Sequence, residues 1–220
     1  MPCANSCTSL VLHQSLPYFK DFSLNERSFT FGQHKIKVLQ NWEEDGIAGV
    51  VWESAVQLGN YLTKHHNVVK NRRVIELGCG TGLVSLLANC LNAKQVIATD
   101  RLQSLNLIKK NLQLNDNHLE VVALDLTNEI DRKQVKHNFL PKIDVILGAD
   151  LLYVTEIIPD LVLTMHILAN SETSILFAFK ERYSHITALF FKEISSLFEH
   201  KLLEEDVQRK LYIYSLRKIC

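Results

Sequence analysis

The sequence predicts an α/β domain with a mainly parallel, Rossmann-like sheet, and three observations carry that prediction. Apolar runs typical of strands alternate with helical stripes from residue 73 to residue 197. The first of these runs leads directly into a glycine turn, which in such folds joins a strand to a helix. Two more strand-like runs end the chain with a charged stretch between them, so we expect a terminal strand that is antiparallel to the others.

The N-terminal part is expected to be separate from this alternation. Residues 1–27 have weak periodicity and predict a partly disordered tail, so that the single folded domain covers 28–220. Within that domain, Gly32-Gln33-His34-Lys35 separates two short strand-like runs and predicts a hairpin. Apolar residues at helical spacing then predict a helix over 51–65.

The remaining elements follow in order. Strands are expected at 73–77, 95–100, 119–125, 144–149 and 173–179, with helices near 83–91, 102–114, 156–169 and 185–197. The terminal strands are expected near 200–205 and 211–217, joined by a turn at Glu204-Glu205-Asp206. Because ligands of such sheets bind outside the carboxyl ends of the strands, we expect the site to include Glu76 to Gly82, Asp100, Asp125 and Asp150.

Composition narrows the class of protein. A chain of 220 residues suits one well-buried domain. Lys plus Arg and Asp plus Glu are both 24, and this balance argues against stable binding to nucleic acid through clustered cations. No apolar run has transmembrane length, and the N-terminus lacks the pattern of a signal peptide. The five scattered cysteines predict neither a zinc site nor disulfides, so we expect a soluble cytoplasmic protein without a metal.

The glycine turn indicates a nucleoside-containing cofactor. Residues 73–82 read Arg-Val-Ile-Glu-Leu-Gly-Cys-Gly-Thr-Gly, and the next predicted strand ends on Asp100, where a carboxylate can accept hydrogen bonds from ribose hydroxyls. The dinucleotide pattern G-x-G-x-x-G would need a glycine at position 83, which is Leu83. Glu76 beside the turn would repel a pyrophosphate but suits a cationic amino-acid end, which S-adenosylmethionine has. The alternatives are a purely structural turn and, less favoured, a nicotinamide oxidoreductase.

Three further groups of residues have both a functional and a structural interpretation. Asp150 and Tyr153 follow a predicted strand and would place a carboxylate and a phenol beside the cofactor; otherwise Asp150 caps a helix and Tyr153 is half-buried. Trp52 is either a core tryptophan or a ring packed along the cofactor, with Glu53 facing the cofactor's amino group. The run 180–183 is either a solvated strand end or a cluster that holds a protein substrate.

Several runs together resemble one family. Trp-Glu-Ser-Ala at 52–55, Glu-Leu-Gly-Cys-Gly-Thr-Gly-Leu-Val at 76–84, Thr-Asp-Arg at 99–101 and Ile-Leu-Gly-Ala-Asp-Leu-Leu-Tyr at 146–153 are similar to the seven-strand S-adenosylmethionine-dependent protein-lysine methyltransferases with a D-x-x-Y motif. Within this family the chain most resembles the branch that acts on DnaK-type heat-shock chaperones. The match runs from about Phe29 to Tyr214.

The resemblance implies the residues of the site. It assigns cofactor contacts to Trp52, Gly78, Cys79, Gly80, Asp100 and Ala149. Many members have a tryptophan after Leu-Thr, and this chain has Asn128 at that position. The Asn128 amide would then hydrogen-bond the edge of the adenine in place of the tryptophan. Asp125 is a second candidate for the same contact. The implied catalytic residues are Asp150, which would bind and orient the incoming lysine, and Tyr153, which would line its channel.

The implied reaction is transfer of a methyl group from S-adenosylmethionine to a neutral lysine amine. The implied partner is a DnaK-type chaperone, and the enzyme is expected to be a monomer. Two alternatives stay open at this point. In the first, the methyl acceptor is a side chain of another protein or a small molecule. In the second, the chain is a catalytically silent module that only binds the cofactor.

Overall fold

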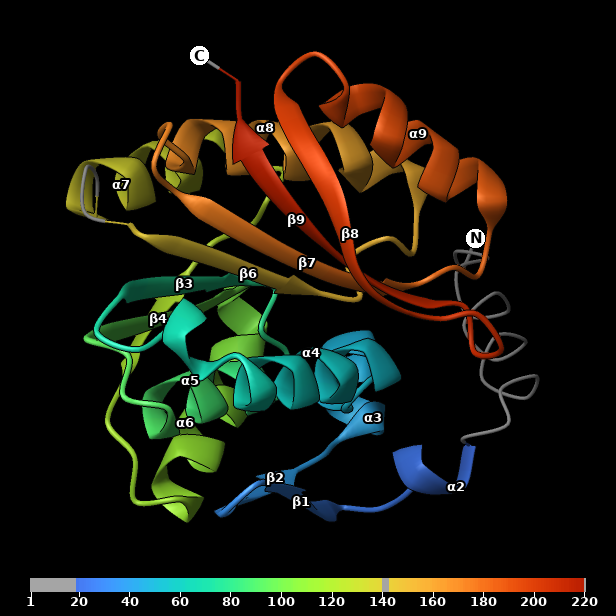
Figure 1. Ribbon diagram of the computed structural model, residues 1–220. Coiled ribbons are helices and arrows are strands. Elements are labelled where there is room, and N and C mark those ends of the chain that lie inside the picture. Colours follow the sequence, from blue (N-terminus) through green and yellow to red (C-terminus); the bar gives the residue numbers. More distant parts are fainter. Residues whose placement is uncertain (1–18, 140–142, 220) are drawn as a thin grey trace, which may run out of the picture.

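The computed structural model describes residues 19–139 and 143–219, and its centre is a seven-stranded sheet between two layers of helices (Figure 1). The strand order is β5-β4-β3-β6-β7-β9-β8. Only β9 runs against the others, because it pairs antiparallel with both β7 and β8, and this confirms the predicted fold class. The strands are β3 (Arg73–Leu77), β4 (Gln95–Asp100), β5 (Glu120–Ala123), β6 (Val145–Ala149), β7 (Ser174–Lys180), β8 (Phe198–Asp206) and β9 (Leu211–Lys218).

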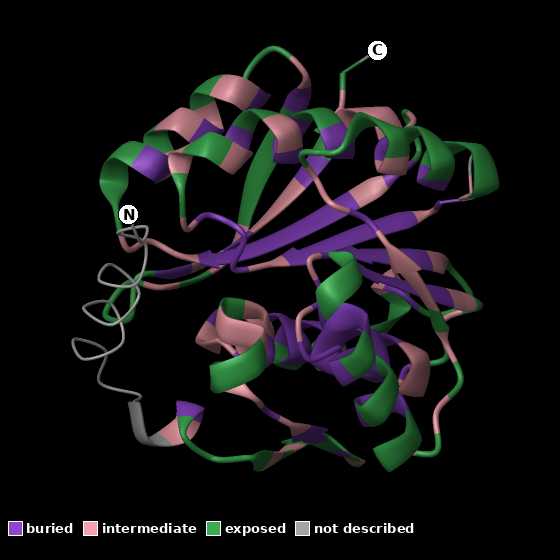
Figure 2. Ribbon diagram, turned by 180° about the vertical axis from the view of Figure 1, so that it is seen from behind, coloured by how far each residue is buried: buried purple, intermediate pink, exposed green. Residues whose placement is uncertain are grey.

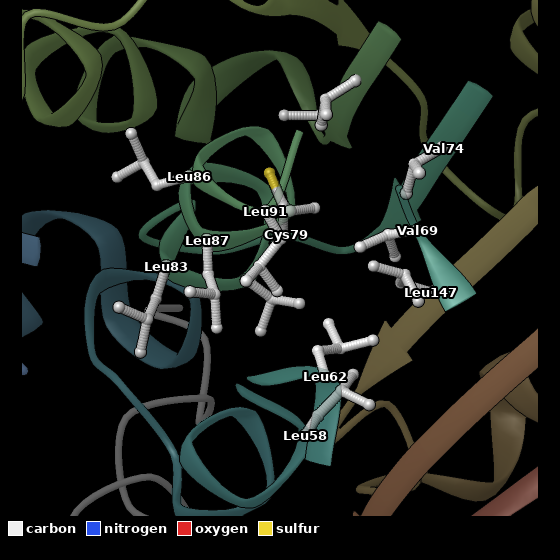
Figure 3. Close-up of a cluster of buried hydrophobic side chains, with 14 of the residues drawn as sticks. Leu58, Leu62, Val69, Val74, Cys79, Leu83, Leu86, Leu87, Leu91 and Leu147 are labelled. Atoms are coloured by element: carbon white, nitrogen blue, oxygen red, sulfur yellow. The ribbon is translucent and has the colours of Figure 1, made fainter. Parts of the chain in front are cut away.

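Helices cover both faces of this sheet (Figure 1). One layer contains α4 (Glu53–Lys64), α5 (Leu83–Cys90) and α6 (Leu105–Leu114); the other contains α7 (Glu129–Phe139), α8 (Ile158–Leu168) and α9 (Ser184–Ile194). Successive strand residues point to opposite faces, so Val74 joins the core under α4 and α5 while Ile75 joins the core under α8 and α9. Figure 3 shows the first of these cores, and Figure 2 shows burial concentrated in the strands and in the helix faces toward them.

The N-terminal hairpin is part of the first core. Strands β1 (Glu26–Phe31) and β2 (His34–Leu39) pair antiparallel, and Phe31, Ile36 and Val38 are buried together with residues of α4 and α5. The fully buried side chain of Asn111 on α6 bonds the Leu39 backbone at both its N–H (2.6 Å) and its carbonyl (3.1 Å) and donates to the Thr81 carbonyl (2.9 Å). One amide therefore ties the hairpin to the glycine turn.

Short helical segments connect the hairpin to the sheet. They are α2 (Phe19–Phe22), α3 (Trp42–Asp45) and a 3-10 turn at Gly46–Gly49, with further 3-10 turns at His66–Val68, Leu102–Ser104 and Thr155–Ile157. Gln40 holds this connection: its amide donates to the carbonyls of Asp21 (2.8 Å) and Leu24 (2.9 Å), and its oxygen accepts from the Val51 N–H at 2.9 Å. The segment 46–52 is thereby fixed against the body of the domain.

One sequence-based expectation is wrong and one element was missed. The turn expected at Glu204-Glu205-Asp206 is part of β8, and the chain turns at 207–210 instead; β8 is an edge strand, where outward charged side chains are tolerated. The helix α7 was not expected, because its sequence is mostly polar and contributes little beyond Val135 to the core. Its signal was the charge pattern, acidic in the first turn and basic in the last.

The N-terminal boundary stays a prediction. The structure places Glu26 and Arg27 in β1, while residues 1–18, including Cys3 and Cys7, lie outside the described residues. Over residues 19–139 and 143–219, no helix is long and apolar enough to cross a membrane. Over the same ranges, no group of three or more His, Cys, Asp or Glu residues is arranged to hold a metal ion.

Candidate active site

A cavity of about 320 Å³ lies at the point where the order of strands reverses, between β3 and β6. Open α/β sheets bind ligands at this switch point, and the volume lies at the lower end of the range typical of small-molecule sites, about 300–1,000 Å³. The cavity brings together nearly all the predicted residues. Those that line it are Trp52, Glu76, Gly78, Cys79, Gly80, Asp100, Asp125, Ala149, Asp150 and Tyr153.

The glycine turn needs its glycines. Gly78, Gly80 and Gly82 have φ values of +57°, +54° and +81°, a region that side-chain-bearing residues rarely adopt. A Cβ atom on Gly78 would lie 2.5 Å from Leu151 Cδ2, and one on Gly80 would lie 3.0 Å from the Ala48 carbonyl oxygen. The turn is therefore open to a ligand because it carries no side chains at these positions.

Asp100 is held by the backbone that it faces. Its Oδ2 accepts from the Gly80 N–H and its Oδ1 accepts from the Arg101 N–H, both at 2.8 Å. Burial raises the pKa of Asp100, and these hydrogen bonds oppose that rise. Each carboxylate oxygen keeps lone-pair capacity, which suits a pair of neighbouring hydroxyl groups such as those of a ribose.

Cys79 contributes its backbone to the site rather than its thiol. The Cys79 N–H donates to the Thr99 carbonyl at 2.9 Å, which fixes the turn against β4. The side chain lies in the core among the leucines that include Leu87 and Leu91 (Figure 3). Burial raises the pKa of the thiol well above its usual range, so it is not a nucleophile at neutral pH.

Glu76 is a buried acid at the wall of the cavity. It accepts a hydrogen bond from the Ser85 hydroxyl on α5. Burial raises its pKa from 4.5 to about 8, so that it is mostly protonated at neutral pH. A cation placed beside it would favour the carboxylate, and its proton would then be released.

The wall opposite the turn comes from residues 46–52, which sequence reasoning did not assign apart from Trp52. Ile47 and Ala48 line the cavity, and the Trp52 indole N–H donates to the Ile47 carbonyl at 2.9 Å. Phe22 packs against the Trp52 ring with centroids 4.9 Å apart. In the sequence, Asn41 could have indicated this segment, because asparagine is a common helix cap. Its side chain caps α3, just before residues 46–52, by accepting from the Glu44 N–H.

The structure places Asn128 away from the lining of the cavity. Its side-chain oxygen accepts from the N–H groups of Ile130 (2.9 Å) and Asp131 (3.4 Å), and so caps the start of α7. Leu126 and Thr127 line that end of the cavity instead, together with Asp125. This placement disfavours the expected contact between the Asn128 amide and an adenine edge.

Asp150 lies at the other end of the cavity and is paired with a residue that sequence reasoning did not assign. Its two carboxylate oxygens accept from Arg182 at 2.6 and 2.7 Å. The Arg182 guanidinium also lies over the Trp52 ring, 4.8 Å from its centroid. Asp150 does not cap α8, which begins at Ile158, so the structural alternative for this residue is wrong.

The neighbours of this pair are also partly buried. Burial alone would lower the pKa of Arg182, but the hydrogen bonds and charge of Asp150 outweigh it and raise the pKa. Tyr153 lines the same cavity but is influenced by the charges of Arg101, Asp100 and Asp125 rather than by this pair; burial raises its pKa, so its phenol is neutral at physiological pH. Glu53 pairs with Lys180 and does not line the first cavity, so it does not face a ligand there as expected.

A second cavity of about 1060 Å³ adjoins the first and shares Val51 and Trp52 with it. Arg182, Lys180 and Glu53 line this second cavity, together with the end of the β8–β9 hairpin. The Asp150–Arg182 pair therefore joins the two cavities, since Asp150 lines the first and Arg182 the second. Residues 180–183 were expected to be either a solvated strand end or a cluster that holds a protein substrate. In the structure, Lys180 and Arg182 are paired with acids and line the second cavity.

The first cavity fits a nucleoside that carries a cationic amino-acid end. Asp100 offers acceptors for hydroxyl groups, Glu76 offers a carboxylate for an ammonium, and the glycine turn leaves backbone exposed between them. Leu126 and Thr127 give the part of the cavity next to Asp125 a mixed apolar and hydroxyl surface. S-adenosylmethionine has these three chemical parts.

Comparison with known proteins agrees with this site. A family model described as lysine methyltransferase matches residues 30–197. The chain is 33% identical over 193 residues to the protein N-lysine methyltransferase METTL21A of Mus musculus, covering 87% of each chain. It is 30% identical over 205 residues to the EEF1A lysine methyltransferase 3 of Xenopus tropicalis, covering 91% of this chain and 88% of that protein.

Solved structures show the same fold at lower identity. A methylase of ribosomal protein L11 from Lactobacillus delbrueckii has a TM-score of 0.60 at 18% identity, covering 87% of this chain and 98% of that one. A T. thermophilus 16S rRNA methyltransferase in complex with AdoMet and guanosine has a TM-score of 0.63 at 16% identity; the match covers 89% of this chain and 51% of that one, about half its length. The chain belongs to the lysine methyltransferase family, and it is an S-adenosylmethionine-dependent protein-lysine N-methyltransferase.

Proposed function

We propose that the chain methylates a lysine side chain of a DnaK-type heat-shock chaperone, as a cytoplasmic monomer. The family membership supports a lysine of a protein as the acceptor. The choice of chaperone rests on the resemblance of the runs at 52–55, 76–84 and 146–153 to that branch of the family. The observation that carries the proposal is the first cavity, which is lined by the glycine turn and by Glu76 and Asp100, which suit the cofactor, and also by the Asp150 carboxylate and the Tyr153 phenol.

The cofactor end holds the methyl donor through the glycine turn and two acids. We assign Asp100 to the ribose hydroxyls and Glu76 to the amino-acid end, with Gly78, Cys79 and Gly80 providing backbone contact. Ala149 and Trp52 line the passage toward the acceptor end. The bound donor supplies an electrophilic methyl group on a sulfonium.

The acceptor end must receive a neutral amine. A free lysine with a pKa of about 10.4 is deprotonated at roughly 0.04% at pH 7, which corresponds to about 4–5 kcal/mol. A largely buried pocket with aromatic walls lowers that cost by disfavouring the ammonium. We assign Trp52 and Tyr153 to these walls and Asp150 to accepting an N–H of the amine, which orients its lone pair toward the methyl group.

The test is transfer of label from S-adenosylmethionine to protein in a cell extract, followed by identification of the modified lysine. Wild-type protein is expected to label a DnaK-type chaperone. Asp150→Asn is expected to lose transfer by at least about tenfold while keeping cofactor affinity. Asp144→Asn is the matched control, because Asp144 lies just before the opposite end of the same strand and its carboxylate accepts from the Arg73 backbone N–H at 2.7 Å. Unchanged transfer in Asp150→Asn would refute the role of Asp150.

Elongation factor 1A is a second candidate substrate, favoured by the 30% identity to the EEF1A lysine methyltransferase 3. The same experiment separates the two candidates, because mass spectrometry of the labelled peptide names the modified protein. Label on elongation factor 1A alone would replace the chaperone as substrate and leave the lysine chemistry in place.

A further inference from the structure

Asp150, the carboxylate at the acceptor end, carries no uncompensated charge. Arg182 meets both of its oxygens in a two-bond fork at 2.6 and 2.7 Å. The side chain of Asp150 is 3% exposed and that of Arg182 is 14% exposed, so water screens the pair little. Arg182 itself is held from the other side by the Trp52 ring.

An incoming lysine would not displace Arg182. Separating a buried, doubly hydrogen-bonded pair is among the most costly single changes in a protein. A lysine ammonium is a compact point charge, and it cannot reproduce the planar fork by which a guanidinium binds a carboxylate. The Asp150–Arg182 pair therefore stays closed when the acceptor enters.

We propose that Arg182 is a positioning residue whose charge cancels that of Asp150, so that the acceptor lysine enters the site as a neutral amine. This inference rests on the proposed function. The ammonium first loses its proton to water; the nitrogen lone pair then forms the bond to the methyl carbon as the carbon–sulfur bond breaks. The positive charge passes from sulfur to nitrogen, and a neutral thioether is left.

The pair can orient the amine without favouring its charged form. A carboxylate without a partner at 4–6 Å would raise the pKa of an amine by about 1–3 units. Oδ1 of Asp150 also accepts from the Lys180 backbone N–H at 3.5 Å, whereas Oδ2 has a second lone pair beyond the one that Arg182 uses and can accept an N–H of the neutral amine. Arg182 thus removes the conflict between binding the amine and keeping it deprotonated.

The other ionisable groups around the pair leave Asp150 as the dominant charge. Glu53 on α4 and Lys180 on β7 form an ion pair beside it, and Tyr183 contributes a phenol from the loop that follows β7. The more distant charges are at the cofactor end and across the second cavity. These are Glu76, Asp100, Arg101, Asp125 and Tyr153 in the first cavity, and the ion pairs Arg27–Asp21, Lys64–Glu204 and Arg209–Asp206, with Glu205, in the second.

The test uses a lysine side-chain analogue in the cofactor-free protein. Isotope-labelled n-butylamine (¹³C at the carbon next to nitrogen) reports its own protonation through its chemical shift, and it is titrated between about pH 7 and about pH 10. The pKa of the bound amine is expected to lie below that of the free amine in the wild type. Arg182→Gln is expected to raise the bound pKa by about 1 unit or more.

Two further variants separate charge from structure. Arg182→Lys keeps the charge and is expected to keep the wild-type value, even if the protein is less stable. Asp150→Asn/Arg182→Gln removes both charges and is expected to return the bound pKa toward the wild-type value. An unchanged bound pKa in Arg182→Gln, or a wild-type cavity that takes up no butylamine, would overturn the inference.

The same inference predicts a pattern in turnover. With the protein acceptor, Arg182→Gln is expected to bind the ammonium more tightly, so KM falls, while kcat at pH 7 drops about tenfold or more and its pH profile moves to higher pH by about 1 unit or more. A loss of kcat with an unshifted profile would reduce Arg182 to a structural role. Because the butylamine measurement needs no protein substrate, failure to label a chaperone would count against the proposed function and leave this inference standing.

Discussion

The two ends of the first cavity are built in different ways. The cofactor end is made largely of backbone: Gly78 and Gly80 have positive φ, and the Asp100 carboxylate accepts from the N–H of Gly80 in the turn and from the N–H of Arg101 after β4. The acceptor end is made of side chains, with Asp150, Arg182 and Trp52 meeting from three separate parts of the chain. The backbone of the cofactor end suits a cofactor that is the same in every reaction, whereas the side chains of the acceptor end can differ with the methyl acceptor.

The difference also concerns charge. The cofactor end has a carboxyl group, Glu76, that is mostly protonated at neutral pH. The carboxylate of the acceptor end, Asp150, is paired with the Arg182 guanidinium. One end is therefore arranged to accept a cation, and the other to avoid holding one. Substitutions at the two ends test this difference in charge.

The largest effect is expected at the acceptor end. Asp150→Leu should lower the free energy of unfolding by about 3 kcal/mol, because it leaves the Arg182 charge mostly buried without its partner. Asp150→Leu/Arg182→Leu should recover at least half of that loss. Asp206→Leu is the control, since the Asp206–Arg209 pair is exposed and such pairs contribute at most about 1 kcal/mol. Urea unfolding measures all three, and equal losses in Asp150→Leu and Asp206→Leu would contradict the account.

The next effect concerns the glycine turn. Gly80→Ala should weaken S-adenosylmethionine binding about 30-fold, or about 2 kcal/mol, because the new Cβ meets the Ala48 carbonyl at a strained φ. Gly32→Ala has nearly the same φ, +58°, in the hairpin turn away from the cavity, and should lower stability alone. Calorimetric titration gives both affinities. Equal affinity in the two variants would show that the turn does not contact the cofactor.

A smaller effect follows from Glu76. With its pKa near 8, ionisation on binding a cationic cofactor should release close to one proton at pH 7, and affinity should rise about tenfold per pH unit below pH 8. Glu76→Gln should abolish both effects. Calorimetry in buffers of different ionisation enthalpy counts the protons. Release that persists in Glu76→Gln would assign the proton to another group.

The same shift has a consequence for stability with a defined sign. Between pH 4.5 and about 8, folded Glu76 holds a proton that the unfolded chain has released. Its contribution to stability is therefore fully present below pH 4.5 and is lost as pH rises through about 8. The wild type should lose more stability than Glu76→Gln over that range in urea unfolding.

The smallest effect is expected at Asn128. Asn128→Ala should lower stability by about 1 kcal/mol, because it removes the cap of α7, and should leave cofactor affinity unchanged. Thermal unfolding and a binding titration check the two parts. A loss of affinity without a loss of stability would restore the adenine contact that the sequence suggested.

The cofactor end was predictable from the sequence because it is local. A strand, three glycines and Asp100 occupy fewer than thirty consecutive positions, and each residue type has a backbone reason. The acceptor end was not, because Asp150 and Arg182 are 32 positions apart and meet only through the parallel pairing of β6 and β7. Nothing in the sequence distinguishes Arg182 from a solvated residue at a strand end.

The missed helix has the same kind of cause. In α7, Arg132 is buried and pairs with Asp160, a contact that only the docking of α7 beside α8 creates. Periodicity of apolar residues cannot register a helix whose buried face includes an arginine. Likewise, the end of β8 is charged because it lies at the sheet edge, and its sequence therefore reads as a turn.

The most direct measurement is a crystal structure with S-adenosylhomocysteine bound. We expect the ligand between the carboxyl ends of β3 and β6, with its ribose on Asp100 and with both Asp150–Arg182 hydrogen bonds intact. A ligand bound elsewhere, or an Arg182 side chain turned away from Asp150, would contradict this expectation.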